Sequence, residues 1–500
     1  MSTVYTHSFD SPVYTGTVTV NTGLFIGGKF VDSVDKETID VYNPAKGEVI
    51  TKVSVGNVKD IDIAVKVAQQ AFKTSWGLKV PAYERGRYLS KLADLMEEHA
   101  DELAAIEALN AGKVFQFVRH AEVPAIIKFA RYYAGWADKN NGQTIEPNEN
   151  KLAYTRNEPI GVCALVTPWN FPLITLLTKI LPALVTGNTV VIKPSEVTPL
   201  SALKLAELVN EAGFPPGTVN IIPGYGQTAG QALAEHLHIG KISFTGSTVV
   251  GRKIMEASAK SNLKRVTLEL GGKSPTIVFD DADLSQAVPW VTAGIFSHSG
   301  QMCVAGSRVF VQEGIYDRFV EAFSAAAQSV NNGDGFDPAS QQGPLVSETQ
   351  MKRVLGYIES GKADGATLVT GGTRKGETGY FVQPTIFTDV SPDMKIVREE
   401  IFGPVCAVIK FKTEQEVIEL ANDTVYGLSS QVFSENISRA LRVAHALEAG
   451  QTLVNCGTGA EPAIPFGGVK QSGFGKELGQ QALEAYTVQK SIHVHIAPVQ

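Results

Sequence analysis

The sequence predicts an α/β protein organised around a doubly wound parallel sheet. Its 500 residues exceed what one hydrophobic core usually holds, so we expect more than one domain. Hydrophobic residues make up 44% and charged residues 19% of the chain, which is typical of globular proteins. Between residues 161 and 271, strand-like runs alternate with helical runs. That alternation is typical of a parallel sheet covered by helices on both faces.

Each element of this region follows from its local pattern. Short apolar runs such as G-V-C-A-L-V-T favour buried strands, whereas apolar residues three and four positions apart favour helices. The expected strands are 161–167, 188–194, 218–224, 241–246 and 265–271, and the expected helices are 173–185, 200–213, 229–236 and 248–259. Ligands of such sheets bind beyond the carboxyl ends of the strands. We therefore look for functional residues in the loops that follow these strands.

The N-terminal part is patterned differently. Residues 1–20 are rich in Ser, Thr and Val but weakly patterned, and we expect a loose arm. Alternating runs in residues 23–53 predict short antiparallel strands. Two amphipathic helices follow, and Gly112 lies just past the end of the second.

Three further segments complete the organisation. The polar stretch 141–159 is expected to leave the globular body, either as a loop or as a contact with another subunit. A second α/β region is expected from about Lys273 to Ser472, with strand-like runs such as V-C-A-V-I-K-F. The alternating S-I-H-V-H-I at 491–496 predicts one last strand.

Charge and cysteine usage narrow the class of protein. A net charge of −7, with a pI of about 5.8 and no basic cluster, argues against nucleic acid and anionic membranes as partners. The four cysteines form no C-x-x-C pair and the histidines have no metal-ligand spacing, so we expect no metal. No apolar run approaches the ~18 residues of a membrane span. The N-terminus resembles no secretion signal, and we expect a cytoplasmic protein.

The stretch G-Q-M-C-V-A-G-S-R, residues 300–308, holds the leading candidate for chemistry. Small residues around Cys303 let a backbone and a ligand approach closely. To act as a nucleophile, the thiol needs a pKa below its ordinary value of about 8.5, or a base that takes its proton. The alternative is an inert buried cysteine, the commoner state of an unpaired thiol.

Two other loops carry groups that suit a cysteine nucleophile. Asn170 lies in T-P-W-N-F-P after the first strand, where its amide can donate to a developing oxyanion; the alternative is ordinary turn chemistry. Glu269 interrupts the apolar end of the fifth strand in L-E-L-G-G-K-S-P. Burial tends to raise the pKa of such a carboxylate, which suits a general base; the alternative is an outward-facing strand residue.

The remaining strand ends are typical of a dinucleotide site. Lys193 and Glu196, in K-P-S-E, can bond to ribose hydroxyls, and an acidic group there favours NAD because it repels a 2′-phosphate. In F-T-G-S-T-V-V-G, Gly246 permits a tight turn and Ser247 opens a helix, whose N-terminal amides can receive pyrophosphate. The alternative for the K-P-S-E residues is a solvated loop pair.

Seven motifs then follow one another in a fixed order: T-P-W-N-F-P, K-P-S-E, F-T-G-S-T, L-E-L-G-G-K-S-P, G-Q-M-C, E-E-I-F-G-P and P-F-G-G. In this order and spacing, the sequence resembles the NAD(P)-dependent aldehyde dehydrogenase superfamily, and especially its general tetrameric cytosolic or mitochondrial members. The similarity extends from about Leu24 to His495.

The resemblance implies a mechanism for the oxidation of an aldehyde to a carboxylic acid. Cys303 would be the nucleophile, and the Asn170 side chain with the Cys303 amide would hold the oxyanion. After hydride transfer a thioester would remain, and Glu269 would activate the water that hydrolyses it. Lys179 and Glu477 match positions that relay protons from Glu269.

The resemblance also implies the ligand-binding residues. NAD is implied in preference to NADP. The implied cofactor-binding residues are Thr167, Pro168, Trp169, Lys193, Ser195, Glu196, Gly226, Phe244, Gly246, Ser247, Gly251, Leu270, Gly271, Glu400 and Phe402. The implied substrate-binding residues are Phe171, Thr175, Met302 and Phe466. Related substrate channels are often lined by aromatic residues, but the corresponding positions here are Thr175, Thr178, Ser297 and Ala460, which predicts a roomier and more polar channel.

Three folding units are implied: a Rossmann-type, five-stranded NAD-binding domain (1–140 and 160–271), an α/β catalytic domain (272–472) and a β oligomerisation arm (141–159 and 485–500). The arm implies a homotetramer, a dimer of dimers. Competing hypotheses are a CoA-acylating or semialdehyde-specific relative, a non-catalytic structural protein and a thiol esterase. Glu269 argues against CoA acylation, because that chemistry must spare the thioester from water.

Overall fold

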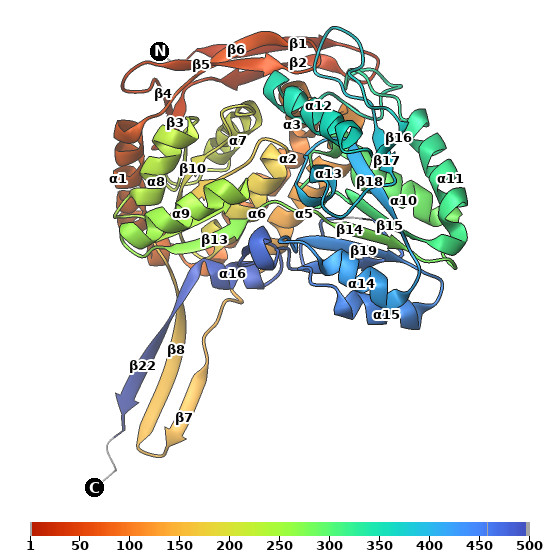
Figure 1. The fold of residues 1–500 in the computed structure, drawn as a ribbon. Helices are drawn as coiled ribbons and strands as arrows, with labels where there is room; N and C mark the ends of the chain where they lie inside the picture. Colours follow the sequence, from red (N-terminus) through yellow and green to blue (C-terminus); the bar gives the residue numbers. More distant parts are fainter. Residues whose placement is uncertain (1–2, 458, 497–500) are drawn as a thin grey trace.

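The computed structural model describes residues 3–457 and 459–496 (Figure 1). Its largest sheet has eight strands in the order β21-β13-β12-β9-β10-β11-β3-β4. Their bounds are β21 (Gly473–Phe474), β13 (Arg265–Glu269), β12 (Lys241–Thr245), β9 (Val162–Val166), β10 (Thr189–Lys193), β11 (Val219–Ile221), β3 (Leu24–Ile26) and β4 (Lys29–Val31). The α/β class is confirmed, because the five predicted strands pair in parallel at the centre. The five predicted strands form the parallel part of this sheet, and β21, β3 and β4 extend it with antiparallel edges.

Alternate residues of β9 enter two different cores, as a doubly wound sheet requires. Val162, Ala164 and Val166 belong to one apolar cluster, and Cys163 and Leu165 belong to the other. The first cluster is covered by α1 (Val58–Thr74), α8 (Gln231–Glu235) and α9 (Thr248–Lys260). The second is covered by α2 (Ala82–Glu98), α3 (Ala100–Ala111), α5 (Val123–Ala134), α6 (Pro172–Val185) and α7 (Leu200–Glu211).

The second α/β region forms a seven-stranded sheet in the order β16-β17-β18-β15-β14-β19-β20. The bounds are β16 (Thr367–Thr370), β17 (Thr385–Thr388), β18 (Val405–Phe411), β15 (Arg308–Gln312), β14 (Pro275–Val278), β19 (Ser429–Phe433) and β20 (Gln451–Val454). Its helices are α10 (Leu284–Phe296) and α11 (Tyr316–Ser329) on one face, and α12 (Glu348–Ala363), α13 (Lys395–Arg398), α14 (Glu414–Asn422) and α15 (Ile437–Ala446) on the other. The direct connection from β13 to β14 joins the two sheets.

A narrow three-stranded sheet projects from the body (Figure 1). It consists of β7 (Thr144–Asn148), β8 (Lys151–Pro159) and β22 (Thr487–His495). The pairing of β8 with β22 begins at Thr487, opposite Pro159, so the last strand is longer than the predicted 491–496. Residues 497–500 of the predicted arm lie outside the described residues. We call this three-stranded sheet the arm; its predicted role in oligomerisation remains a prediction.

The expected loose arm at residues 1–20 was wrong for the described part of that segment. Strands β1 (Val4–Asp10) and β2 (Thr15–Asn21) form an antiparallel hairpin. Val18 and Val20 are fully buried in the core that contains α3 and α7. The alternation of valine with threonine in T-V-T-V therefore marked a half-buried strand, which the polar composition obscured.

Other elements lie outside the predicted scheme. Residues 473–484, which the predicted units left unassigned, add β21 to the large sheet and contain most of α16 (Gln481–Ala485), which packs against its core. By contrast, the hairpin of β5 (Thr38–Asn43) with β6 (Glu48–Ser54) agrees with the antiparallel strands predicted in residues 23–53. A short turn, α4 (Phe115–Phe117), follows α3. Within the described residues, no helix is both long and apolar enough to cross a membrane.

Candidate active site

Two other backbone segments pack closely against the backbone around Cys303. The residue follows α10 and the short turn Ser297–Gly300. Gly300 has φ +68°, and a Cβ there would lie 2.1 Å from the carbonyl oxygen of Gly403. A Cβ on Gly272, after β13, would lie 2.2 Å from the carbonyl oxygen of Cys303. Because these neighbours are backbone atoms, only glycine fits at either place, and the contacts fix the position of the thiol.

Asn170 comes within one hydrogen bond of this loop. It follows β9 and is buried, and its Nδ2 donates to the carbonyl oxygen of Gln301 at 2.8 Å. A carboxamide has two N–H donors, and this bond uses one of them. The structure therefore places this amide beside the segment that carries Cys303, and its role as an oxyanion donor stays a prediction.

Glu269 is the last residue of β13 and is 3% exposed. Neither of its carboxylate oxygens has a hydrogen-bond partner among the described residues. Burial, and then the charge of Glu477, raise the pKa of Glu269 well above its usual range. A Cβ on Gly467 would lie 2.6 Å from Oε1, so only a glycine leaves room for this carboxylate. An unpartnered carboxylate with a raised pKa has the properties of a general base.

Lys179 and Glu477 form a buried ion pair beside Glu269. Lys179 Nζ contacts Glu477 Oε1, and it also donates to Ser243 Oγ at 3.1 Å. The backbone of Glu477 is fixed by two hydrogen bonds to Phe466, of 2.6 Å and 2.8 Å. The predicted relay residues and the predicted substrate residue Phe466 thus lie together.

The environment of Cys303 does not activate the thiol by itself. Burial, followed by the charges of Glu400 and Glu269, raises the pKa of Cys303 to about 12. The lowered pKa that would make a free thiolate is therefore absent from this structure. An attack at neutral pH therefore needs a base or a cation near the sulfur.

Glu400 is held against the loop that follows β13. The backbone N–H of Gly272 donates to its Oε1 at 3.0 Å, and burial raises the pKa of this carboxyl to about 7. The ring of Phe402 meets that of Trp169 edge-on, with centroids 5.2 Å apart. Glu400 and Phe402 line a cavity of about 230 Å³ next to the Cys303 segment.

The predicted substrate residues differ in their immediate surroundings. Phe171 lies between Lys113 Nζ, 4.3 Å from the ring centroid, and the ring of His298 at 5.4 Å. The hydroxyl of Thr175 donates to the carbonyl oxygen of Phe171. Met302 packs instead against the core under α10 and lines the cavity beside Glu400, so its surroundings differ from those of the other predicted substrate residues.

The predicted dinucleotide residues gather at the carboxyl ends of the parallel strands. Lys193 Nζ donates to Glu196 Oε2 at 3.1 Å and to the carbonyl oxygen of Gly224 at 2.8 Å. Ser247 caps α9, and its Oγ accepts from the N–H of Val250 at 3.4 Å. The N–H of Gly246 donates to the carbonyl oxygen of Glu269 at 3.0 Å, which ties this loop to the candidate base.

The other predicted cofactor residues lie around the same edge. Thr167 and Pro168 follow β9, Ser195 follows β10 and Gly226 comes after β11. Phe244 and Leu270 are buried in the core with α9, where a Cβ on Gly251 would meet Leu270 at 2.7 Å. A Cβ on Gly271 would lie 2.4 Å from Glu400 Oε2. At both glycines the space that a Cβ would need is filled by a neighbouring side chain.

Sequence reasoning missed residues that shape the site through hydrogen bonds. Ser472 Oγ donates to the carbonyl oxygen of Gly271 at 2.7 Å, and its own carbonyl accepts from Leu270 N–H at 2.9 Å. Gln301 supplies the acceptor for Asn170, and Ser243 the acceptor for Lys179. Ser472 lies in the glycine-rich stretch 465–475, which could have drawn attention to it in the sequence. Ser243 lies inside β12, and no sequence pattern marks it as part of the site.

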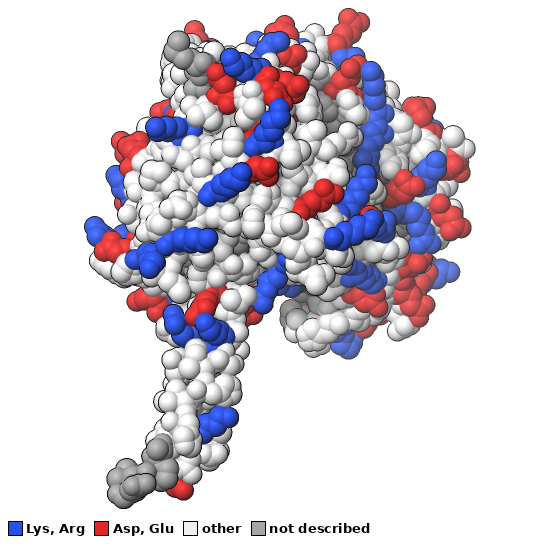
Figure 2. Space-filling model, turned by 90° about the vertical axis from the view of Figure 1, so that its left-hand side faces the viewer, with Lys and Arg blue, Asp and Glu red and all other residues white. Residues whose placement is uncertain are grey.

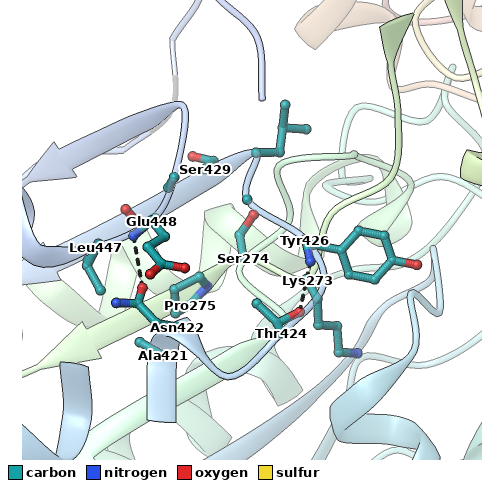
Figure 3. A pocket seen from close by; sticks show the side chains of 14 residues that line it. Lys273, Ser274, Pro275, Ala421, Asn422, Thr424, Tyr426, Ser429, Leu447 and Glu448 are labelled. Carbon is teal, nitrogen blue, oxygen red and sulfur yellow. Dashed lines mark hydrogen bonds between the residues drawn. The ribbon is translucent and has the colours of Figure 1, made fainter. Parts of the chain in front are cut away.

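A separate depression of about 250 Å³ lies where the β13–β14 connection meets residues 421–430 and 447–449 (Figure 3). It is lined by Lys273 and Ser274 together with Thr424, Tyr426 and Glu448, and none of the predicted site residues lines it. In the part of the chain that the structure describes, no group of three or more His, Cys, Asp or Glu side chains is arranged to hold a metal.

Comparisons with known proteins agree with this architecture. The family model described as "Aldehyde dehydrogenase family" matches residues 30–492. An aldehyde dehydrogenase of Agaricus bisporus is 56% identical over 99% of both chains, and the mouse "Aldehyde dehydrogenase, cytosolic 1" is 51% identical over 95% of both. The Bacillus cereus structure described as an "NAD+ complex structure of aldehyde dehydrogenase" has a TM-score of 0.94 at 48% identity, covering 95% of this chain and 97% of that one. The resemblance and the enzyme class predicted from the motifs are confirmed: this chain belongs to the aldehyde dehydrogenase family of oxidoreductases.

Proposed function

We propose that this enzyme oxidises an aldehyde to a carboxylate with NAD⁺ and water, through a thioester on Cys303. The observation that carries the proposal is the convergence of three groups from separate loops. The amide of Asn170 donates a hydrogen bond to Gln301, two residues before Cys303. Gly272, three residues after Glu269, packs closely against the backbone of Cys303. Nucleophile, oxyanion donor and base are the parts that acyl transfer requires.

The residues at the strand ends fit a dinucleotide. Val249 and Val250 in the first turn of α9 are 62% and 40% exposed, and such apolar surface suits the face of an adenine. The helix N-terminus behind Ser247 suits a pyrophosphate, and Lys193 and Glu196 would hold the ribose. Glu196 disfavours a 2′-phosphate, which supports NAD over NADP. The similar Bacillus cereus enzyme is described as an NAD⁺ complex. When bound, NAD⁺ supplies the hydride acceptor.

The first half of the reaction forms a carbon–sulfur bond. The Cys303 thiol gives up its proton to solvent water, and the sulfur attacks the carbonyl carbon of the aldehyde, so that the carbonyl oxygen becomes an oxyanion. Asn170 Nδ2 and the Cys303 N–H would donate to that oxygen, and one such donor contributes ~10²–10³ in rate. Collapse of the oxyanion restores the carbonyl group and expels hydride, leaving a thioester on Cys303.

The second half of the reaction is hydrolysis. Glu269 takes a proton from water, the resulting hydroxide attacks the thioester carbonyl, and the carbon–sulfur bond breaks. Burial makes Glu269 a stronger base than a solvated carboxylate. Glu477, whose Oε1 is held by the ammonium group of Lys179, would receive the proton from Glu269. A base in this position favours hydrolysis over transfer of the acyl group to CoA.

The substrate remains an aldehyde class rather than one compound. Threonine at positions 175 and 178, with Ser297 and Ala460, supports a roomier and more polar channel than small aliphatic aldehydes need. We therefore expect broad use of aliphatic and aromatic aldehydes. A higher kcat/KM for a bulky aromatic aldehyde than for acetaldehyde would support this expectation, and a strong preference for acetaldehyde would contradict it.

The arm supports a proposed homotetramer, built as a dimer of dimers. Figure 2 shows positive and negative side chains interspersed over the body, whereas most of the arm's surface carries no charge. Ile145, Tyr154, Val494 and Ile496 on and beside its strands are 37–45% exposed. A sheet that extends into solvent with a mostly uncharged surface and several exposed apolar side chains is typical of a subunit interface. A cytosolic location is proposed with it, by analogy with the mouse relative that is named cytosolic.

The test is NADH formation with a panel of aldehydes. We expect wild-type enzyme to form NADH, Cys303→Ala to form none, and Glu269→Gln to release acid slowly. If Cys303→Ala retained wild-type turnover, the nucleophile would be wrong. Unchanged steady-state rates in Glu269→Gln would remove this residue from the base role.

A further inference from the structure

The two carboxylate oxygens of Glu477 have chemically different partners. Oε1 contacts the ammonium group of Lys179, whereas Oε2 accepts from the hydroxyl of Thr178 at 2.8 Å. Both partners are adjacent residues of α6, and Glu477 is 6% exposed. The backbone of Glu477 is already fixed to Phe466, so these two contacts decide where its carboxylate points.

The hydroxyl of Thr178 has a second acceptor within reach. Its Oγ1 is 3.0 Å from the carbonyl oxygen of Thr175, one turn earlier in α6. A hydroxyl has one proton to donate and two lone pairs with which to accept. When Glu477 is ionised, Thr178 donates to Oε2. When Oε2 carries a proton, that proton is donated to Oγ1, and Thr178 turns its own proton to Thr175.

The same side chain therefore satisfies Glu477 in both protonation states. Lys179 does not have this property, because an ammonium group only donates. A proton that arrives at Glu477 is accordingly accommodated on Oε2, while Oε1 stays against the cation. Leaving Oε2 unpartnered in this buried position would be costly in either state.

We propose that Thr178 is a positioning residue, which holds Glu477 ready to accept and release the proton that Glu269 takes from water. This inference rests on the proposed function of Glu269. The proton leaves water for Glu269, then leaves Glu269 for Oε2 of Glu477, which restores the base; release from Oε2 to solvent completes the cycle. The threonine thus links a wall of the substrate channel to the proton path.

Other ionisable groups also face Glu477 and belong in any account of its pH dependence. The cations are Lys179 from α6 and Lys241 from β12, and the carboxylate is Glu269 from β13. The phenols of Tyr133, from α5, and Tyr486, after α16, are also near Glu477. Burial raises the pKa of both phenols, and the charge of Glu477 raises it further. Thr178 is uncharged, so its removal alters hydrogen bonding without adding or removing a charge here.

The experiment compares Thr178→Val, which has nearly the same shape without the hydroxyl, with Thr178→Ser, which keeps the hydroxyl. Thr74→Val is the matched control, because the hydroxyl of Thr74 likewise bonds to a helix carbonyl but lies at the exposed end of α1. Steady-state kcat and KM, the pre-steady-state burst of NADH and the pH profile of kcat are measured for each variant. Thermal unfolding establishes that each variant is folded.

For Thr178→Val we expect kcat to fall about tenfold, equivalent to ~1.4 kcal/mol in the barrier, with KM within about twofold. A burst of NADH should remain, because hydride transfer precedes hydrolysis, and the pH profile should shift. Thr178→Ser and Thr74→Val should stay within about twofold of wild type. A kcat for Thr178→Val within twofold of wild type would overturn the proposal. So would a loss in Thr178→Ser as large as in Thr178→Val, or a change confined to KM.

A second readout separates this inference from the proposed oxidation. A 4-nitrophenyl ester can acylate Cys303 without any cofactor, and release of the acyl group then reports hydrolysis alone. The same difference between valine and serine is expected in that deacylation rate. Wild-type enzyme that formed no NADH, with the two variants still different in deacylation, would rule out the proposed oxidation. It would still support the proposed positioning role of Thr178. Equal deacylation rates would overturn the role of Thr178.

Discussion

Replacing Gly272 with alanine tests how tightly the backbone fixes the position of Cys303. The added Cβ would lie 2.2 Å from the carbonyl oxygen of Cys303, and ordinary contact between these atoms needs about 1 Å more. Neither partner is the end of a flexible side chain, so a backbone segment must move. The N–H of Gly272 also donates to Glu400 Oε1 at 3.0 Å, so movement of this residue disturbs Glu400 as well.

The expected cost follows from that displacement. A misplacement of about 1 Å at a reacting centre lowers the rate by ~10²-fold, so kcat/KM should fall about 100-fold, or ~2.7 kcal/mol. The assay is initial-rate NADH formation with one good aldehyde substrate. Thermal unfolding is measured in parallel, to separate a moved thiol from an unfolded chain.

Gly356→Ala is the matched control for this substitution. Gly356 is an exposed residue of α12, and no described heavy atom outside its own helix lies within 4 Å of the added Cβ. Its activity should be unchanged and its unfolding free energy up to ~1 kcal/mol higher, because alanine favours helices. A folded Gly272→Ala enzyme with kcat/KM within threefold of wild type would show that this backbone contact does not fix the position of Cys303.

Three further predictions concern the oxyanion donor, the base and the arm. Asn170→Ala should lower kcat ~10²–10³-fold with a smaller change in KM, as steady-state kinetics will measure. Because burial raises the pKa of Glu269, the folded chain keeps a proton that the unfolded chain releases, and ionisation destabilises the fold as pH rises. The Tm of Glu269→Gln relative to wild type should therefore increase as the pH rises above the ordinary titration range of a carboxyl group. Ile145→Lys combined with Val494→Lys should reduce the solution mass measured by light scattering, because charges would enter the proposed interface.

Different results would contradict each of these expectations. An Asn170→Ala enzyme with wild-type kcat would show that its amide donates nothing to the oxyanion. A Tm difference for Glu269→Gln that stays constant or shrinks with pH would mean that this carboxyl is not protonated by burial. An unchanged mass for the doubly substituted arm would place the subunit interface elsewhere.

Much of the central architecture could be predicted because it depends on local patterns. The run G-V-C-A-L-V-T specifies β9 whatever surrounds it, and its alternate residues enter two cores. Short glycine-rich turns after strands could be recognised for the same reason. The hairpin of β1 and β2 was missed because its burial depends on α3 and α7, which lie far away in the sequence.

The residues of the candidate site show the same difference between local and long-range patterns. Cys303, Asn170 and Glu269 are unusual in their local context and could be named in advance, although their roles remain proposals. The hydrogen bond from Asn170 to Gln301, and the contact between Thr178 and Glu477, join residues 131 and 299 positions apart. No local pattern encodes such a contact. The raised pKa of Cys303 was equally hidden, since it depends on charges that the fold brings close.

The central claim is that the acyl group passes through a thioester on Cys303 that Glu269 helps to hydrolyse. The most direct test is to mix Glu269→Gln with saturating aldehyde and NAD⁺, quench in acid and measure the intact and peptide masses. We expect an acyl adduct on the peptide that contains Cys303, with about one NADH formed per adduct. We expect no adduct in Cys303→Ala or in the absence of NAD⁺. Sustained formation of NADH by Glu269→Gln at the wild-type rate, with Cys303 unmodified, would contradict it.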